Sequence, residues 1–242
     1  MTNSSGMKLD VLVVAAHPDD AEICVGGTLL KLKAAGRRIG IVDLTRGEMG
    51  TRGSSDDRAR EVEAANAHLQ LDVRANLGLP DGRVEDSLDA RERLAALFRL
   101  HAPSVVLAQH AVDHHPDHAA TGRIAREAWY LSGLKKLAQA TGGGEARRPT
   151  RFYHYMGHVP FEPTFVVDIG TVWQAKRELV ACYESQLRPD GAGDDGSHFL
   201  YGSDIQQRME TRARFYGERI GARHGEPLLA LGPLPCFDPL LD

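Results

Sequence analysis

Residues 10–22 read DVLVVAAHPDDAE and join an unbroken apolar run to a short polar turn. The Val-rich part, Asp10–Ala16, is typical of a strand that is buried on both faces of a parallel sheet. A helical pattern follows from about Glu22 to Ala35, and Gly36 suits the position just past a helix end. This order predicts an α/β protein, with the polar turn at the carboxyl end of its first strand.

The same alternation continues through the first half of the chain and then weakens. Further strands are expected at Ile39–Leu44, Val73–Leu77 and Ser104–Gln109, and further helices at about Asp57–Leu69, Ser87–His101 and from Ala119. The second half predicts strands at Phe152–Met156 and Phe165–Ile169, helices at Val172–Ser185 and Asp204–Gly221, and glycine-rich loops at Gln139–Arg151 and Arg188–His198. We therefore predict a doubly wound, mostly parallel sheet of the Rossmann type with a less regular C-terminal half.

Length and composition are those of one globular domain. The chain of 242 residues has no internal repeat and no linker-like segment, so we predict a single domain over residues 1–242, with residues 1–7 as a flexible leader. The net charge of −4 argues against a nucleic-acid binder, and no apolar run predicts a membrane span. Three separated cysteines and the lack of a signal-peptide pattern favour a cytoplasmic protein.

The turn after the first strand carries side chains suited to a metal site. His17 offers an imidazole nitrogen and the aspartates that follow offer carboxylate oxygens, all of which Zn²⁺ accepts. In a tight turn His17 and Asp20 can converge on one ion, so that Asp19 points elsewhere and stays available as a base. The alternative is a plain strand-to-helix turn in which Asp20 only caps the helix, because Asp and Pro are common turn residues.

A second polar cluster, HHPDH at residues 114–118, follows the predicted strand Ser104–Gln109. If that strand neighbours the first one, His118 would complete a ligand set of two histidines and one aspartate that leaves room for water and substrate. We expect Asp117 and His115 to form a carboxylate–imidazole pair that fixes the tautomer of the ring. A His-rich loop can also be a solvated turn, but two such motifs at strand ends of one sheet favour a metal centre.

The expected metal is zinc, the usual choice for amide hydrolysis, and Fe²⁺ could fill the same ligand set in a reducing cell. Two histidines and one carboxylate also hold iron in non-haem oxygenases. Those enzymes are typically built on a β-barrel, which the alternating pattern does not predict. We therefore favour hydrolysis over oxidation.

The motifs AHPDDAE and HPDH resemble the two signatures of the LmbE-like (PIG-L type) deacetylases, metal-dependent enzymes that act on N-acetylglucosamine conjugates. The resemblance covers nearly the whole chain and includes GGTLLKLKAAG, DLTRGEMGTRG, LGLPDG and KRELVACYESQ. It implies three metal ligands, namely His17, Asp20 and His118. It also implies a base at Asp19 and an acid or charge-stabilising imidazole at His115, supported by Asp117. Within the family, ACYESQ, RARFYGERIG and PLLALGPLP are most similar to the deacetylase of bacillithiol biosynthesis, which acts on N-acetylglucosaminyl-malate.

The predicted partner is a small N-acetylglucosamine conjugate, whose aglycone we expect to meet basic side chains. Arg46 and Arg58 follow the second predicted strand, and a guanidinium can hold a carboxylate of malate with two hydrogen bonds. Relatives carry a tyrosine near the start of the late helix that helps to bind the oxyanion. Ile205 occupies the expected position here, and Tyr201 is the candidate substitute. The resemblance also implies a homo-oligomer.

Two alternatives stay open on the sequence. The same chemistry could act on another conjugate, such as an inositol-linked glucosamine, a chitooligosaccharide or a thiol conjugate, because the irregular loops would set this specificity. A non-catalytic metal- or sugar-binding protein is the second alternative. The carboxylate of Asp19 argues against it, since binding alone needs no spare base.

Overall fold

One mixed sheet, in the strand order β3-β2-β1-β4-β5-β7-β6, organises the computed structural model, which describes residues 6–50, 54–187 and 205–232. The strands are β1 (Val11–Ala15), β2 (Ile39–Asp43), β3 (Val73–Asn76), β4 (Val105–Gln109), β5 (Arg151–Tyr155), β6 (Phe165–Asp168) and β7 (Gly225–Ala230). The first five run parallel to their neighbours, whereas β7 lies antiparallel to both β5 and β6. The predicted mostly parallel α/β sheet is confirmed, with an antiparallel edge added.

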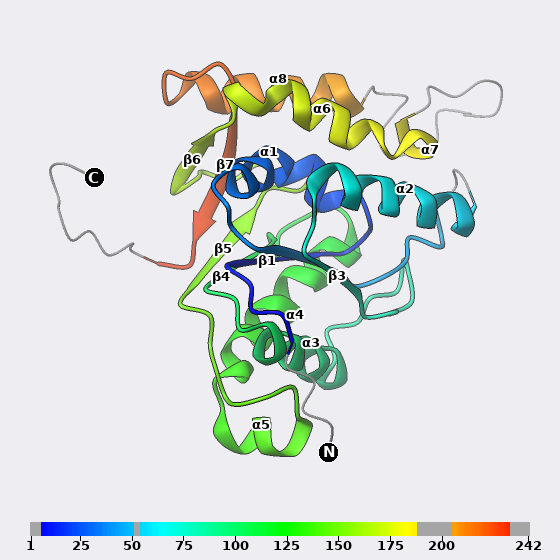
Figure 1. The fold of residues 1–242 in the computed structure, drawn as a ribbon, viewed down its shortest axis with the longest axis vertical. Helices are drawn as coiled ribbons and strands as arrows, with labels where there is room; N and C mark the ends of the chain where they lie inside the picture. The colour runs from blue at the N-terminus through cyan, green and yellow to red at the C-terminus, as the bar shows by residue number, and fades with distance from the viewer. Residues whose placement is uncertain (1–5, 51–53, 188–204, 233–242) are drawn as a thin grey trace, which may run out of the picture.

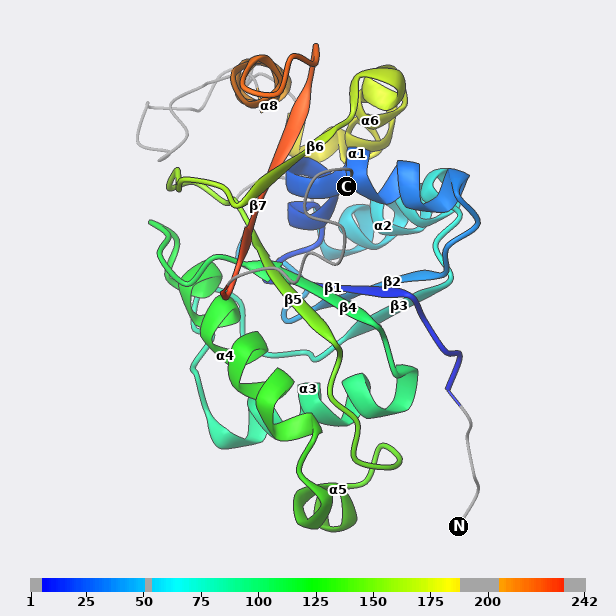
Figure 2. The ribbon, with the colours of Figure 1, turned by 90° about the vertical axis from the view of Figure 1, so that its left-hand side faces the viewer.

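Helices cover both faces of the sheet. They are α1 (Asp20–Ala34), α2 (Ser55–Leu69), α3 (Leu88–His101), α4 (Pro116–Ser132), α5 (Lys135–Thr141), α6 (Trp173–Ala181), α7 (Glu184–Leu187) and α8 (Ile205–Glu218). In Figure 1, α1, α2, α6 and α8 lie above the strands, and α3, α4 and α5 lie below them. Figure 2 shows that α6 and α8 form an additional outer layer over α1. Among the described residues, none of the helices has the length and apolar character of a membrane span.

The side chains of β1 divide between two cores, because successive residues of a strand point to opposite faces of the sheet. Leu12 and Val14 pack in the core that contains residues of α3 and α4. Val11 and Val13 pack in the core that contains residues of α1, α2 and α6. A third, smaller core joins α6 to α8 through Trp173, Val180, Met209 and Ala213. The burial of β1 on both faces agrees with its unbroken apolar sequence.

Several boundaries differ from the sequence analysis. The strand β7 was not expected, because its sequence GEPLLA contains a proline and no polar alternation. Helix α5 occupies the start of the region that was predicted as a loop from Gln139. Helices α1 and α4 begin at Asp20 and Pro116, earlier than predicted, so Asp20 and His118 lie in first helical turns. The predicted loop Arg188–His198 and Tyr201 lie outside the described residues.

The strand order creates a switch point between β1 and β4. From β1 the chain proceeds through α1 to β2 on one side, and from β3 it crosses through α3 to β4 on the other side of β1. In open α/β sheets, ligands bind in the crevice beyond the carboxyl ends of strands at such a point. Both polar motifs begin there.

Candidate active site

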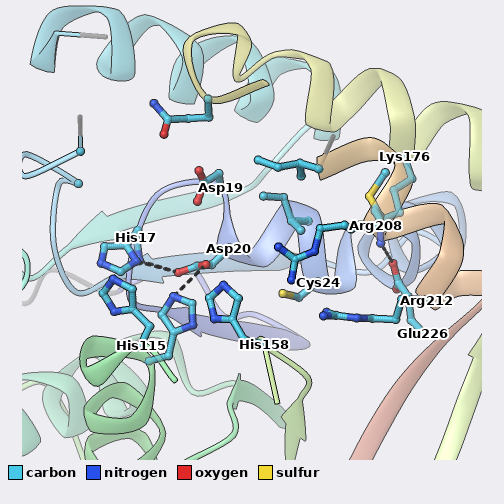
Figure 3. Close-up of a pocket in the computed structure, with 18 of the residues that line it drawn as sticks. His17, Asp19, Asp20, Cys24, His115, His158, Lys176, Arg208, Arg212 and Glu226 are labelled. Carbon is cyan, nitrogen blue, oxygen red and sulfur yellow. Dashed lines mark hydrogen bonds and ion pairs between the residues drawn. The ribbon is translucent and has the colours of Figure 1, made fainter. Parts of the chain in front are cut away.

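The two motifs line one pocket of about 360 Å³ at the carboxyl ends of β1 and β4 (Figure 3). His17 and Asp20 follow β1, and His115 and His118 follow β4. Helix α4 can begin abruptly here because Pro116 stands at its first position, where the missing N–H costs no hydrogen bond. The expectation that β4 neighbours β1 and brings the motifs together is therefore met.

Three side chains converge as ligands of one ion would. His17 Nδ1 lies 3.2 Å from Asp20 Oδ2, and His118 Nε2 lies 3.3 Å from Asp20 Oδ1. Donor atoms about 2.0–2.2 Å from a tetrahedral zinc ion are about 3.4 Å apart, so this spacing fits a zinc site. Two imidazoles and one carboxylate, which leave a fourth position open to the pocket, are the donor set of a catalytic zinc site.

The second nitrogen of each ligand ring faces a carboxylate. His17 Nε2 lies 3.0 Å from Asp81 Oδ1 and 3.3 Å from Asp117 Oδ2, while His118 Nδ1 lies 3.3 Å from Asp113 Oδ1. Burial alone would raise the pKa of Asp81, but its hydrogen bond with His17 helps to hold that pKa at about 2. Such partners fix the orientation of a ligand ring and increase its basicity.

Asp81, Asp113 and His158 join the site although the sequence analysis did not select them. Asp113 Oδ1 lies 2.8 Å from His158 Nδ1, and the His158 ring stacks on His118 with centroids 4.9 Å apart. Asp81 comes from the LGLPDG segment, and Asp113 lies directly before HHPDH, so both had a local signal. His158 follows β5 and had no local signal in the sequence, because only the order of the strands in the sheet brings it to the pocket.

We expected the carboxylate of Asp117 to pair with His115, but in the structure it does not. It accepts hydrogen bonds from the main-chain N–H groups of Gly82 and Val84, at 2.7 and 3.1 Å, and faces His17. The main-chain N–H of Asp117 instead donates to His115 Nδ1 at 3.2 Å, as part of the helix cap. Burial, and then the neighbouring histidines, lower the pKa of His115. A neutral ring whose Nδ1 accepts a hydrogen bond carries its proton on Nε2.

Asp19 is held apart from the ligands. Its backbone φ of 112° is one that residues other than glycine rarely adopt, so this turn stores strain. Arg58 Nη1 donates to Asp19 Oδ2 and to the carbonyl oxygen of Pro18, both at 2.8 Å. Burial raises the pKa of Asp19 to about 7, and the guanidinium of Arg58 opposes this shift. A carboxyl group with a pKa near neutrality is suited to accept and return a proton.

The residues predicted to bind the substrate lie in different positions relative to the pocket. Arg58 lines the pocket, but its hydrogen bonds serve Asp19 and Pro18, so it positions the turn. Arg46 is exposed and is not among the residues that line the pocket. Ile205 lines the pocket at the start of α8 and offers no side-chain hydrogen bond there.

The last residue of AHPDDAE has a structural role. Glu22 Oε1 accepts hydrogen bonds from Arg74 Nη1 at 2.6 Å and from the Tyr183 hydroxyl at 2.9 Å. Arg74 also donates twice to Asp43, at 2.8 and 3.0 Å. This buried network ties the first turn of α1 to β2, β3 and the segment after α6, which fixes the turn that carries His17 and Asp20.

The opposite wall of the pocket comes from α6, α8 and β7 (Figure 3). Lys176 Nζ lies 2.6 Å from Glu226 Oε1, and both side chains are only 2% exposed. Glu226 also accepts from the main-chain N–H groups of Gly27 and Thr28, at 2.9 and 2.7 Å. These amides are available because α1 is interrupted at Val25, so a second helical segment begins there and favours a carboxylate.

The sequence is similar to known deacetylases. The PIG-L family, described as GlcNAc-PI de-N-acetylase, matches residues 12–129. A 1D-myo-inositol 2-acetamido-2-deoxy-alpha-D-glucopyranoside deacetylase of Nocardiopsis dassonvillei is 32% identical over 89% of this chain and 97% of its own. A probable N-acetyl-alpha-D-glucosaminyl L-malate deacetylase 2 of Bacillus anthracis is 34% identical over 49% of this chain and 58% of its own.

Solved structures share the whole fold. The conserved protein TT1542 from Thermus thermophilus is 38% identical, with a TM-score of 0.85 over 97% of this chain and 99% of that one. The N,N'-diacetylchitobiose deacetylase from Pyrococcus horikoshii is 27% identical, with a TM-score of 0.79 over 96% of this chain and 88% of that one. The similarity therefore includes both walls of the pocket.

Proposed function

Because the chain belongs to the PIG-L family of de-N-acetylases, we propose that it hydrolyses the N-acetyl amide of an N-acetylglucosamine conjugate with Zn²⁺ as its metal, giving acetate and a free amine. One arrangement carries the proposal. The ligand atoms of His17, Asp20 and His118 converge beside a pocket that also holds a separate buried carboxylate, Asp19. A site that only bound metal would not need this fourth group.

The roles of the metal and of the base are distinct. His17, Asp20 and His118 would hold the zinc, which would supply Lewis acidity toward the amide carbonyl and the attacking water. Asp19 accepts a proton from that water and returns it to the departing nitrogen, so one carboxyl group acts first as base and then as acid. The hydrogen bond from Arg58 holds the Asp19 carboxyl group in the pocket during both transfers.

His115 is the proposed donor to the carbonyl oxygen. With its Nδ1 engaged by the N–H of Asp117, the neutral ring presents Nε2–H, which can donate to an oxygen that becomes negatively charged. A preorganised donor of this kind is worth about 10²- to 10³-fold in kcat. Asp117 therefore supports His115 through its main chain and His17 through its side chain.

The proposed substrate is N-acetylglucosaminyl-malate, as in bacillithiol biosynthesis. Two observations support an acidic aglycone. One is the partial match to the probable N-acetyl-alpha-D-glucosaminyl L-malate deacetylase 2 of Bacillus anthracis, and the other is the presence of cations on the pocket wall formed by α6, α8 and β7. Inositol-linked N-acetylglucosamine is the alternative that the match to the Nocardiopsis protein supports. A cytoplasmic location and a homo-oligomeric assembly stay predictions.

The test measures release of primary amine by zinc-loaded protein from N-acetylglucosaminyl-malate, inositol-linked N-acetylglucosamine and free N-acetylglucosamine. Asp19→Asn should lower kcat about 10²- to 10⁴-fold with metal content unchanged. The exposed Asp89, paired with Arg93 on α3, gives the matched control Asp89→Asn. Preference for the malate conjugate would support the full proposal. Equal turnover of all three substrates would exclude specificity for malate. No release from any, with metal bound, would overturn deacetylation.

A further inference from the structure

Helix α8 carries arginines in two different settings. On its exposed side, Arg214 Nη2 lies 2.7 Å from Glu210 Oε1, and Arg219, directly after the helix, pairs with Glu162. Neither of these arginines lines the pocket. Their charges are balanced by neighbours, as is usual for surface arginines of a helix.

Arg212 has the opposite setting. It lines the pocket, and Nη1 donates to the main-chain oxygen of Met156 at 3.3 Å. Within residues 6–50, 54–187 and 205–232, no carboxylate pairs with Arg212. Arg208 lies one turn earlier on the same wall (Figure 3). A guanidinium has five N–H donors, so most of those of Arg212 are available to a ligand.

Two other cations of the pocket are paired with carboxylates. Lys176 pairs with Glu226 at 2.6 Å, and Arg58 pairs with Asp19 at 2.8 Å. For Arg212, in contrast, the described residues give only a contact with a carbonyl oxygen. A partly buried charge without a counter-charge favours an anionic ligand, because the ligand restores the interactions lost with water.

The position of Arg212 limits where this anion sits on the substrate. Cys24 lies on α1 four residues after the ligand Asp20, about 6 Å along the helix axis, and both line the pocket. Met156, whose carbonyl oxygen accepts the hydrogen bond from Arg212, precedes Gly157, and Gly157 lies against Asp113 and His118. In Figure 3, Arg212 lies beyond Cys24 from His17. An anion at Arg212 would therefore lie near the amide at the metal.

We propose that Arg212 forms a subsite for a carboxylate or phosphate on the substituent next to the acetamido group of the substrate. This inference rests on the proposed deacetylation and names the group that recognises the aglycone. It assigns aglycone recognition to α8 instead of to Arg46 and Arg58. A neutral sugar, or an anion at the far end of an oligosaccharide, would not use this contact.

The test compares three substrates: N-acetylglucosaminyl-malate, N-acetylglucosamine 1-phosphate and methyl N-acetylglucosaminide. For Arg212→Gln, the ratio of kcat/KM for an anionic substrate to that for the neutral glycoside should fall about 10- to 100-fold, as expected for a lost charge-assisted hydrogen bond. The matched control, Arg214→Gln on the exposed side of α8, should leave the ratio unchanged. Loss of preference for the malate conjugate alone identifies a carboxylate subsite, and loss for the phosphate alone identifies a phosphate subsite.

A binding measurement separates this inference from the proposed chemistry. Calorimetry with Asp19→Asn gives the affinities of the same compounds without turnover, with and without Arg212→Gln. If no substrate is hydrolysed but the anionic compounds bind more tightly and lose this advantage in Arg212→Gln, deacetylation fails and the subsite stands. If the parent protein binds and turns over neutral and anionic compounds alike, or Arg212→Gln weakens all of them equally, the subsite is overturned.

Discussion

The two walls of the pocket hold their charges in different ways. The metal wall, formed by the turns after β1 and β4, places imidazoles and carboxylates within 3.0–3.3 Å of one another. The α8 wall, formed by α6, α8 and β7, carries one buried ion pair and arginines on a single helix. The metal wall is a connected network in which each ligand depends on several others, whereas the groups of the α8 wall act separately.

This difference separates two kinds of consequence. Loss of a proposed metal ligand or of Asp19 from the metal wall should abolish the chemistry, because these groups hold the metal or move a proton. Changes in the α8 wall should alter stability or substrate preference and leave the metal bound. Matched substitutions in the two walls can therefore test this difference.

The largest contrast is expected between a histidine of the metal wall and a buried histidine that packs on α6 behind the α8 wall, each changed to alanine. His118→Ala should remove bound zinc and lower amine release by about 10⁴-fold or more, since both the Lewis acid and the water activation are lost. His224, buried against Trp173 with ring centroids 4.3 Å apart, contacts no ligand. His224→Ala should therefore retain its zinc, as measured by elemental analysis. Loss of zinc from both variants would mean that the walls are not independent.

The next contrast concerns the buried ion pair of the α8 wall. Glu226→Gln should lower the free energy of unfolding by about 3–5 kcal/mol, because it leaves the charge of Lys176 buried without a partner. Adding Lys176→Met should recover a large part of that loss. Denaturant unfolding of both variants gives the energies, and zinc content should not change. A loss below about 1 kcal/mol for Glu226→Gln would show that water reaches the pair.

A pH effect on stability is expected from His154 in β5. Burial lowers the pKa of this ring to about 4, against about 6.5 in an unfolded chain. Between these values only the unfolded state binds the proton, so stability falls by about 3 kcal/mol as the pH drops through that window. His154→Gln should remove this slope, measured as the difference in unfolding free energy between metal-free variants at pH 7 and pH 4.5. Parallel curves would contradict the assignment.

The smallest effect is expected from a ring partner in the metal wall. Asp81→Asn weakens the contact with His17 Nε2 and should lower zinc affinity about 10- to 100-fold, measured by competition with a chelator. Asp86, in the same loop, pairs with Arg91 and touches no ligand, so Asp86→Asn is the matched control. An unchanged zinc affinity in Asp81→Asn would place the orientation of His17 on Asp117 alone.

The sequence analysis succeeded where the signal was local. An unbroken apolar run predicts a strand buried on both faces, and His17, Asp19 and Asp20 share one turn, so their relative positions follow from chain geometry. The order of residues along the chain also predicted which histidine follows which strand. It did not fix side-chain direction, and for that reason the carboxylate of Asp117 was assigned to His115 although it faces His17.

The sequence by itself determined the α/β alternation and the two turns of the metal wall, because hydrophobic period and short loops act over a few residues. Only the tertiary structure decided the α8 wall. Glu226 reaches Gly27 and Thr28 across 199 and 198 residues, and Arg212 enters the pocket because β7 and the third core place α8 over α1. Contacts between residues so far apart in the sequence depend on the packing of the whole chain. No local sequence pattern therefore predicts the residues that make them.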